Sequence, residues 1–160
     1  MLSKMRNVTL GIIGCGYWGP NFVRNFNRIE GVKVKSICDL NHQRLVHIKE
    51  NYPDIETTDN YVKLINDPRI EAVVVSTPAI SHFKLAKDSL LRGKHVLVEK
   101  PIALKIDEAE ELIDLAKRAS KILMVGHTFK FNPGIIKLKS LVKQGALGKI
   151  YYIYTQRTNL

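Results

Sequence analysis

Three glycines that follow an apolar segment constrain this chain more than any other feature of its sequence. Val8 to Ile13 reads as a β-strand, glycines then stand at positions 14, 16 and 19, and Tyr17 to Arg28 has the pattern of an amphipathic helix. Gly14 would permit the tight turn, Gly16 would let backbone approach a pyrophosphate, and Gly19 would let the helix pack on the strand. The unpaired N–H groups at the helix start add a partial positive charge. The pattern therefore predicts a dinucleotide site.

An acidic residue stands where such a site needs one. Val32 to Cys38 is a second β-forming segment, and Asp39 follows it, about 20 residues after Gly19. A carboxylate at this place accepts hydrogen bonds from the adenosine ribose and repels a 2′-phosphate, so the sequence favours NAD over NADP. Two alternatives stay open. Asp39 could merely cap the following helix, and Arg44 in that helix could pair with a 2′-phosphate.

Strand-like and helix-like segments alternate six times along the chain. This alternation predicts an α/β fold with a doubly wound parallel sheet, a Rossmann fold of strand order 3-2-1-4-5-6. The remaining predicted strands are Ile55–Thr58, Ala72–Val75, His95–Glu99 and Ile122–Val125. The remaining predicted helices are Asn41–Asn51, a short helix capped by Asp59 and running to Ile65, His82–Arg92 and Asp107–Ser120. We place this domain at residues 1–127.

Residues 128–160 are expected to begin a second, truncated α+β domain. Asn132 and Pro133 have the pattern of a helix cap and a first helical residue, and this helix should end before Gly145. Lys149 to Thr155 is strongly β-forming, yet the sequence holds no later strand to pair with it. We therefore expect this chain to be a piece of a longer enzyme.

Composition argues against several classes of function. The net charge of +10 would suit a nucleic-acid partner, but the basic residues are scattered, so no such partner is predicted. No apolar run reaches the roughly 20 residues of a membrane span, and no cleavable signal is visible, which favours a cytoplasmic protein without a membrane partner. Cys15 and Cys38 are predicted to be free thiols, and no metal site is predicted.

Polar residues follow the later strands at the edge of the sheet where ligands bind in open parallel sheets. They are Ser76, Thr77, His82, Glu99, Lys100 and His127. Lys100 is the sharpest candidate for catalysis because Pro101 restrains its backbone and its amine could exchange a proton with a substrate hydroxyl. The alternative is a surface lysine that pairs with Glu99.

Three motifs occur in a fixed order: Gly14-Cys15-Gly16, then Ser76-Thr77-Pro78 followed by His82, then Glu99-Lys100-Pro101. With them the chain resembles the N-terminal part of the glucose-fructose oxidoreductase, inositol dehydrogenase and MocA-like (Gfo/Idh/MocA) family of NAD(P)-dependent sugar dehydrogenases. The resemblance implies that Lys100 lies beside the nicotinamide and assists proton transfer, and that its bond to Pro101 is cis. It places His82 near the cofactor, with a structural histidine as the alternative. The implied NAD-binding residues are Gly14, Gly16, Tyr17, Trp18, Gly19, Asp39, Ser76, Thr77, Pro78, His82, Glu99 and Lys100.

Four further segments carry a narrower resemblance: Gly16–Asn21, Gly126–Phe129, Phe131–Pro133 and Arg157–Leu160. They are similar to the WlbA-like branch, which oxidises the C3 hydroxyl of a UDP-N-acetylhexosamine or its uronate with NAD. This resemblance implies a sugar-nucleotide site that contains His127, Phe131, Asn132, Arg157 and Asn159. The alternatives are helix capping for Asn132, core packing for Phe131 and a solvated strand end for the last two.

The family that the chain resembles takes a catalytic histidine, with an aspartate one helical turn before it, from its second domain. This sequence ends before such a motif. We therefore expect this chain to bind NAD but to be inactive alone, and the full-length enzyme to be a homo-oligomer. The competing hypothesis is a non-catalytic NAD-binding or assembly module whose aromatic strand pairs across a dimer.

Overall fold

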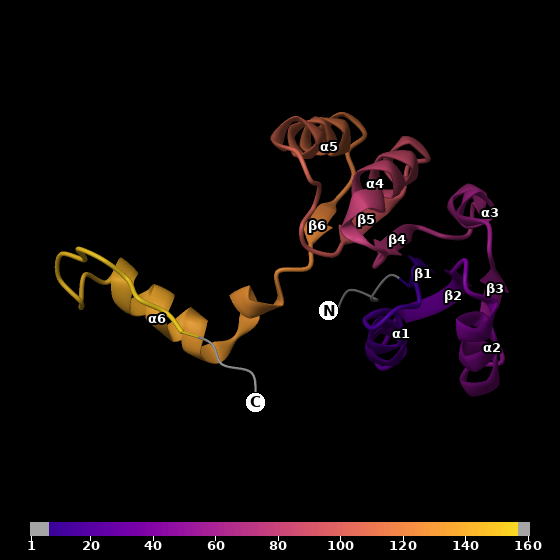
Figure 1. Ribbon diagram of the computed structural model, residues 1–160, viewed down its shortest axis with the longest axis horizontal. Helices are drawn as coiled ribbons and strands as arrows, with labels where there is room; N and C mark the ends of the chain where they lie inside the picture. Colours follow the sequence, from indigo (N-terminus) through magenta and orange to yellow (C-terminus); the bar gives the residue numbers. More distant parts are fainter. Residues whose placement is uncertain (1–6, 157–160) are drawn as a thin grey trace, which may run out of the picture. The chain divides into compact units, whose positions relative to one another are not determined.

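The computed structural model describes residues 7–156. The chain divides between Gly126 and His127 into two compact units. In the first unit, helices cover both faces of a parallel sheet, and Figure 1 shows the sheet between two layers of helices. No helix in residues 7–156 is both long enough and apolar enough to cross a membrane.

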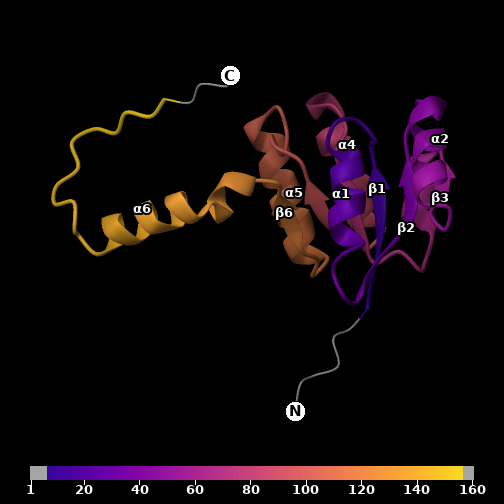
Figure 2. The same ribbon diagram turned by 90° about the horizontal axis from the view of Figure 1, so that it is seen from below.

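The sheet of the first unit has six strands, all parallel, in the order β3-β2-β1-β4-β5-β6. This is the predicted order, which can be followed in Figure 1 from β6 through β5, β4, β1 and β2 to β3; Figure 2 shows β1, β2 and β3 from another side. The order reverses between β1 and β4, and a ligand crevice forms at such a point beyond the carboxyl ends of the strands. The strands are β1 (Val8–Ile13), β2 (Val32–Cys38), β3 (Glu56–Thr58), β4 (Ala72–Val75), β5 (His95–Val98) and β6 (Leu123–Val125).

The register of these strands aligns the residues that follow them. Ile13 lies beside both Cys38 and Val75, Val98 lies beside Val75, and Val125 lies beside Val98. Strands β1, β2, β4, β5 and β6 therefore end in one row, and the residue that follows each of them lies at the same edge of the sheet. These next residues are Gly14, Asp39, Ser76, Glu99 and Gly126.

Five helices pack on the sheet, two on one face and three on the other. α1 (Gly19–Phe26) and α2 (His42–Asn51) share one cluster of buried residues with the sheet. α3 (Tyr61–Asn66), α4 (His82–Leu91) and α5 (Ile106–Arg118) share the other. Strand β4 is apolar throughout because it is covered on both sides, with Val73 and Val75 in one cluster and Val74 in the other.

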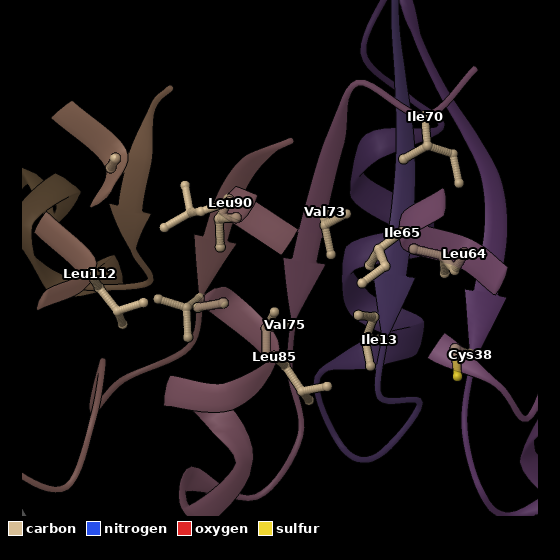
Figure 3. Packing of buried hydrophobic residues seen from close by; sticks show 14 residues of the cluster. Ile13, Cys38, Leu64, Ile65, Ile70, Val73, Val75, Leu85, Leu90 and Leu112 are labelled. Atoms are coloured by element: carbon tan, nitrogen blue, oxygen red, sulfur yellow. The ribbon is translucent and has the colours of Figure 1, made fainter. Parts of the chain in front are cut away.

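The larger of the two clusters lies between the sheet and helices α3, α4 and α5. Figure 3 shows Val73 and Val75 of β4 between the side chains of α3 and α4, with Leu112 of α5 further along. Leu90 and Leu112 are almost completely buried. Burial of one such side chain stabilises the fold by about 1.5–3 kcal/mol, so this cluster holds the strand ends that carry the site in place.

Helices α1 and α3 begin later than predicted, and several other helix ends differ by one or two residues. Helix α1 begins at Gly19 rather than Tyr17, because the chain from Gly14 to Trp18 forms the turn that leads into it. The cap of α3 is Asn60, whose side-chain oxygen accepts a hydrogen bond from the Val62 N–H, so the prediction of Asp59 as cap is wrong. Aspartate and asparagine cap equally well, and packing of Leu64 and Ile65 decides where the helix begins.

The second unit contains a short 3-10 helix, Thr128–Phe131, and helix α6 (Pro133–Lys143). Asn132 caps α6, as predicted, by accepting from the N–H groups of Gly134 and Ile135. Lys149–Thr155 forms no strand within the described chain, where these residues pair with no other strand, and a strand that pairs with segments outside this sequence stays a prediction. A strand needs a neighbour for its backbone groups, and β-propensity describes only how well a residue fits into such a sheet.

Candidate dinucleotide site

A pocket of about 940 Å³ opens at the carboxyl ends of strands β1 to β4. It lies entirely in the first unit, at the point where the strand order reverses. Its walls are Ile13, Gly14, Gly16, Cys38, Asp39, Leu40, Asn41, Arg44, Asp59, Tyr61, Ser76, Thr77, Pro78, Ser81, Lys84 and Leu85. Of the residues predicted to bind the cofactor, the pocket brings together Gly14, Gly16, Asp39, Ser76, Thr77 and Pro78.

The three glycines of the opening turn have different surroundings. Gly14 has a φ of +101°, and a Cβ there would lie 2.6 Å from the Ser76 carbonyl oxygen. A Cβ at Gly19 would lie 2.5 Å from the Gly14 carbonyl oxygen. A Cβ at Gly16, by contrast, would meet only Arg44 Nη1, at 3.9 Å. Gly14 and Gly19 are therefore required by the fold, whereas the absence of a side chain at Gly16 leaves open space beside the backbone.

The same turn presents a row of unpaired donors. The backbone N–H groups of Gly16, Tyr17, Trp18 and Gly19 have no acceptor among residues 7–156. Trp18 is the N-cap of α1, and its side chain makes no capping hydrogen bond. Free N–H groups at a helix start, with the helix dipole behind them, form a site for an anion such as a pyrophosphate.

Asp39 is bonded to the glycine turn rather than to the helix that follows it. One carboxylate oxygen accepts from the Cys15 N–H at 2.6 Å, and the other accepts from the Asn41 N–H at 2.8 Å. Helix α2 is capped by the Asn41 side chain, which accepts from the N–H groups of Gln43 and Arg44. The alternative in which Asp39 caps this helix is therefore wrong.

Arg44 lies next to this carboxylate. Its Nη1 is 3.5 Å from Asp39 Oδ2, and about half of its side chain is exposed, whereas the side chain of Asp39 is 8% exposed. Both residues line the pocket. A carboxylate and a guanidinium thus stand together at the place where the adenosine ribose of a dinucleotide is bound in this fold.

Ser76 and Thr77 hold the wall on the β4 side. The Ser76 hydroxyl donates to the Gly14 carbonyl at 2.8 Å, which joins the end of β4 to the glycine turn. The Thr77 hydroxyl shares a hydrogen bond of 2.6 Å with the Ser81 hydroxyl, which in turn donates to the Pro78 carbonyl. The wall is therefore ordered by its own short hydrogen bonds.

Glu99 and Lys100 follow β5 at the same edge of the sheet. Glu99 is buried and accepts a hydrogen bond from the Lys100 N–H. Its carboxylate packs against Gly126, where an added Cβ would lie only 2.9 Å from Glu99 Oε1. Lys100 is exposed, and its bond to Pro101 is cis, as the family resemblance implied. In the described part of the chain the Lys100 amine has no acidic partner, so the alternative ion pair with Glu99 is not formed.

Other predicted residues lie outside the pocket. Tyr17 and Trp18 are exposed and contact each other edge to face, with ring centroids 5.5 Å apart. His82 is buried, and both ring nitrogens face backbone carbonyls, so the structure favours the structural alternative for this residue.

The predicted sugar contacts belong to the second unit. His127, Phe131 and Asn132 are exposed there. Asn132 caps α6, as its alternative stated, whereas Phe131 is 64% exposed and packs into no core of the described chain. Arg157 and Asn159 lie outside the described residues.

A wall of the pocket that sequence reasoning missed is formed by Asp59, Tyr61 and Lys84. The Tyr61 hydroxyl donates to Asp88 at 2.9 Å, and the Lys84 amine donates to that carboxylate at 2.6 Å and to the Tyr61 hydroxyl at 2.7 Å. Asp88 raises the pKa of Lys84 above its usual range, so this wall carries a cation. Asp59 directly follows β3, and the rule that ligands bind at strand ends could have found it.

The two cysteines are free and buried beside the pocket. Burial, with Asp39 as the next cause, raises the pKa of Cys15 to about 12 and that of Cys38 to about 11. Both thiols are therefore protonated at neutral pH, which removes them as nucleophiles. Within the described residues, no cluster of three or more histidine, cysteine or acidic side chains could hold a metal ion.

The parallel sheet, with its glycine turn, the Asp39 carboxylate after β2 and the row of free N–H groups, defines a dinucleotide-binding Rossmann domain. Comparison with known families agrees, because the model of an oxidoreductase family with an NAD-binding Rossmann fold matches residues 8–127. The chain therefore belongs to the Gfo/Idh/MocA oxidoreductase family, and the cofactor of this domain is NAD.

Individual relatives extend well beyond the segment that this chain matches. It is 33% identical over 146 residues to an uncharacterized oxidoreductase, YdgJ of Escherichia coli (strain K12), covering 91% of this chain and 42% of the relative. The fold matches scyllo-inositol dehydrogenase of Lactobacillus casei with bound NAD(H) and scyllo-inositol, with a TM-score of 0.83 and 25% identity over 90% of this chain and 43% of that one.

A third comparison concerns the narrower resemblance. The WlbA dehydrogenase of Bordetella pertussis, in complex with NADH and UDP-GlcNAcA, matches with a TM-score of 0.85. The match covers 92% of this chain and 42% of that one at 23% identity, and it shows the shared fold alone. In each of these matches the chain spans less than half of the other protein.

Proposed function

We propose that this chain belongs to an enzyme that oxidises a sugar hydroxyl with transfer of hydride to NAD. In this proposal the substrate is a UDP-N-acetylhexosamine or its uronate, oxidised at C3. The main support is the strand register, which aligns the glycine turn after β1 with Lys100 after β5 along one edge of the sheet. Residues 1–127 would form the NAD-binding domain, and residues 128–160 would begin the substrate domain.

The residues at the pocket fit a dinucleotide. The open space at Gly16 and the unpaired N–H groups beside it would hold the pyrophosphate, and Asp39 would accept hydrogen bonds from the ribose hydroxyls. Two walls would enclose the rest of the adenosine half: Ser76, Thr77 and Pro78 form one, and the side chains of Tyr61 and Lys84 form the other. NAD, when bound, supplies the hydride acceptor.

Lys100 would accept or relay the proton of the substrate hydroxyl. A hydroxyl that becomes a carbonyl must lose its proton as hydride leaves the carbon, and a lysine amine at hydrogen-bond distance can accept or relay that proton. Lys100 is exposed at the edge of the sheet, and its side chain is free of any acidic partner within residues 7–156. Changing Lys100→Met in the full-length protein should abolish turnover while leaving NAD affinity within about twofold, and unchanged turnover would remove Lys100 from the mechanism.

The sugar nucleotide would be contacted by residues of the second unit, together with groups from the remainder of the enzyme. His127, Phe131 and Asn132 are exposed and available, and Arg157 and Asn159 complete the proposed set. The resemblance of four segments to the WlbA-like branch supports this substrate class, and a dehydrogenase crystallised with NADH and UDP-GlcNAcA shares the fold. A homo-oligomeric full-length enzyme is part of the same proposal.

Calorimetry on this chain tests the cofactor proposal directly. NAD should bind with measurable heat and more tightly than NADP, and a Gly16→Val variant of unchanged thermal stability should not bind either. A folded chain that shows no heat of NAD binding would contradict the proposed site. Titration with UDP-N-acetylglucosamine and its uronate, before and after NAD, then shows whether any part of the sugar site is present in residues 1–160.

The exposed aromatic residues of the second unit favour one other candidate, a non-catalytic NAD-binding or assembly module. Tyr151, Tyr152 and Tyr154 are largely exposed and could contact a second copy of the chain. Sedimentation of this chain against a Tyr151→Ser, Tyr152→Ser, Tyr154→Ser variant distinguishes the two. Dimerisation that depends on the tyrosines, together with NAD binding but no dehydrogenase activity of the full-length protein, would favour the module.

A further inference from the structure

One buried side chain connects the two loops that carry the proposed chemistry. His82, the first residue of α4, is 1% exposed. Its Nε2 lies 2.7 Å from the carbonyl oxygen of Thr77, and its Nδ1 lies 2.7 Å from the carbonyl oxygen of Pro101. Thr77 lies in the wall of the dinucleotide pocket, and Pro101 directly follows Lys100.

The two acceptors define the state of the ring. A backbone carbonyl oxygen can only accept a hydrogen bond, so each ring nitrogen must donate. A neutral imidazole has one N–H and can donate to one carbonyl only, whereas the imidazolium has two. Both hydrogen bonds can therefore form at the same time only with the doubly protonated ring. Hydrogen bonds from a charged donor are stronger than neutral ones, particularly where water is excluded.

We propose that His82 is a positioning residue that acts as a buried imidazolium and fixes the Lys100 loop to the wall of the NAD pocket. In residues 7–156 no other side chain is hydrogen-bonded to both loops. The role of Lys100 in proton transfer rests on the proposed function, but the clamp itself does not. His82 then acts on the reaction through the placement of Thr77 and Lys100, without touching cofactor or substrate.

Nitrogen NMR on the unchanged chain tests the charge of the clamp. With ¹⁵N-labelled histidine at pH 7, the ring of His82 should show two protonated nitrogens, each with an N–H that exchanges slowly with water because it is buried and bonded. The signals are assigned by their loss in His82→Phe. A ring with one unprotonated nitrogen would overturn the proposal. The state of the ring is read on the unchanged chain, whose five histidines give few signals to assign.

Hydrogen exchange tests the connection between the loops. His82→Phe keeps a ring of similar size but removes both donors, and should raise exchange at residues 76–81 and 99–105 together by about tenfold or more. Ser89→Ala is the matched control, because Ser89 is also buried in α4 but donates only to Leu85 within its own helix. It should lower stability without opening the two loops. Unchanged exchange in either loop of His82→Phe would overturn the clamp.

Cofactor affinity separates this inference from the proposed function. NAD should bind about tenfold more weakly to His82→Phe than to the unchanged chain, since the Thr77 wall is no longer held. Equal affinity in the two chains would overturn the positioning role. Failure of the unchanged chain to bind NAD would contradict the proposed function instead, while the NMR and exchange results would still decide on the clamp.

Discussion

The Asp39 carboxylate and the Cys15 backbone N–H, 24 residues apart in sequence, are joined by a hydrogen bond of 2.6 Å. Asp39 directly follows the second strand and Cys15 lies in the glycine turn after the first, so the bond fixes this carboxylate to the glycine turn. The second oxygen of Asp39 accepts from the Asn41 N–H. A single buried side chain thus both shapes the turn and presents negative charge to the pocket.

Asp39→Asn should separate these two roles. The amide keeps one oxygen acceptor for the turn but loses the charge, so NAD affinity should fall about tenfold and the preference for NAD over NADP should shrink. Asp39→Ala, which leaves two N–H groups without an acceptor, should also cost about 1–3 kcal/mol of stability. Calorimetry and thermal melts measure both effects. Glu56→Gln, the same charge change outside the pocket, is the control, and equal loss of NAD binding there would contradict this account.

Alanine substitutions at the three glycines should give two different results. Gly16→Ala should leave the melting temperature nearly unchanged and weaken NAD binding, because its Cβ meets no protein atom closer than 3.9 Å and enters the open space. Gly14→Ala and Gly19→Ala should destabilise the fold by about 1–3 kcal/mol, because their Cβ atoms collide with backbone. Denaturant melts with and without NAD distinguish the two classes. A Gly16→Ala chain that binds NAD with full affinity would place the pyrophosphate elsewhere.

The buried thiols should be unreactive while the chain is folded. With a pKa of about 12, Cys15 exists as thiolate to a negligible extent at pH 8, whereas an ordinary cysteine is partly ionised there. Iodoacetamide should therefore modify Cys15 at least about 100-fold more slowly in the folded chain than in urea. Mass spectrometry of a Cys38→Ser variant isolates this residue. Rapid labelling of the folded chain would mean that the glycine turn opens readily.

The turn before β4 should make a pH-dependent contribution to stability. Hydrogen bonds from the Arg69 side chain are the main cause that lowers the pKa of Asp67 to about 2 from 3.8. Because the folded-state pKa is the lower one, the contribution is complete above the unfolded value near 4 and is lost as pH falls towards 2. Asp67→Asn should thus cost about 1 kcal/mol at pH 7, since exposed pairs contribute little, and progressively less as pH falls from 4 through about 2. Urea melts across this range measure the difference, and a pH-independent gap would contradict the assignment.

Local sequence was sufficient for the strands and most of the helices. The apolar run of β4, for example, predicts a strand covered on both faces, and Val73 and Val74 do enter opposite clusters. What local sequence could not decide depends on distant parts of the chain. Lys149–Thr155 has the composition of a strand, but its backbone finds no partner in the described chain. The choice of Asn60 over Asp59 as a cap depends on where Leu64 and Ile65 pack.

The candidate site divides in the same way. Gly14, Gly16 and Asp39 could be identified because their roles follow from the order of strand, turn and helix. Tyr61 and Lys84 of the opposite wall could not, since Tyr61 and its partner Asp88, 27 positions apart, meet only after α3 and α4 have packed on the sheet. His82 was expected near the cofactor, and its place in the motif gave no sign that both ring nitrogens would be bonded to carbonyls.

By itself the sequence determined which segments become strands, which turn can receive a phosphate, and the order of the sheet, because these depend on residue periodicity, on glycine and on the handedness of crossover connections. Only the tertiary structure decided which side chains complete the site. Asp39 reaches Cys15, Ser76 reaches Gly14 and His82 reaches Pro101 across the sheet edge. Such contacts form between groups distant in the chain, and their geometry is set by strand register and helix packing.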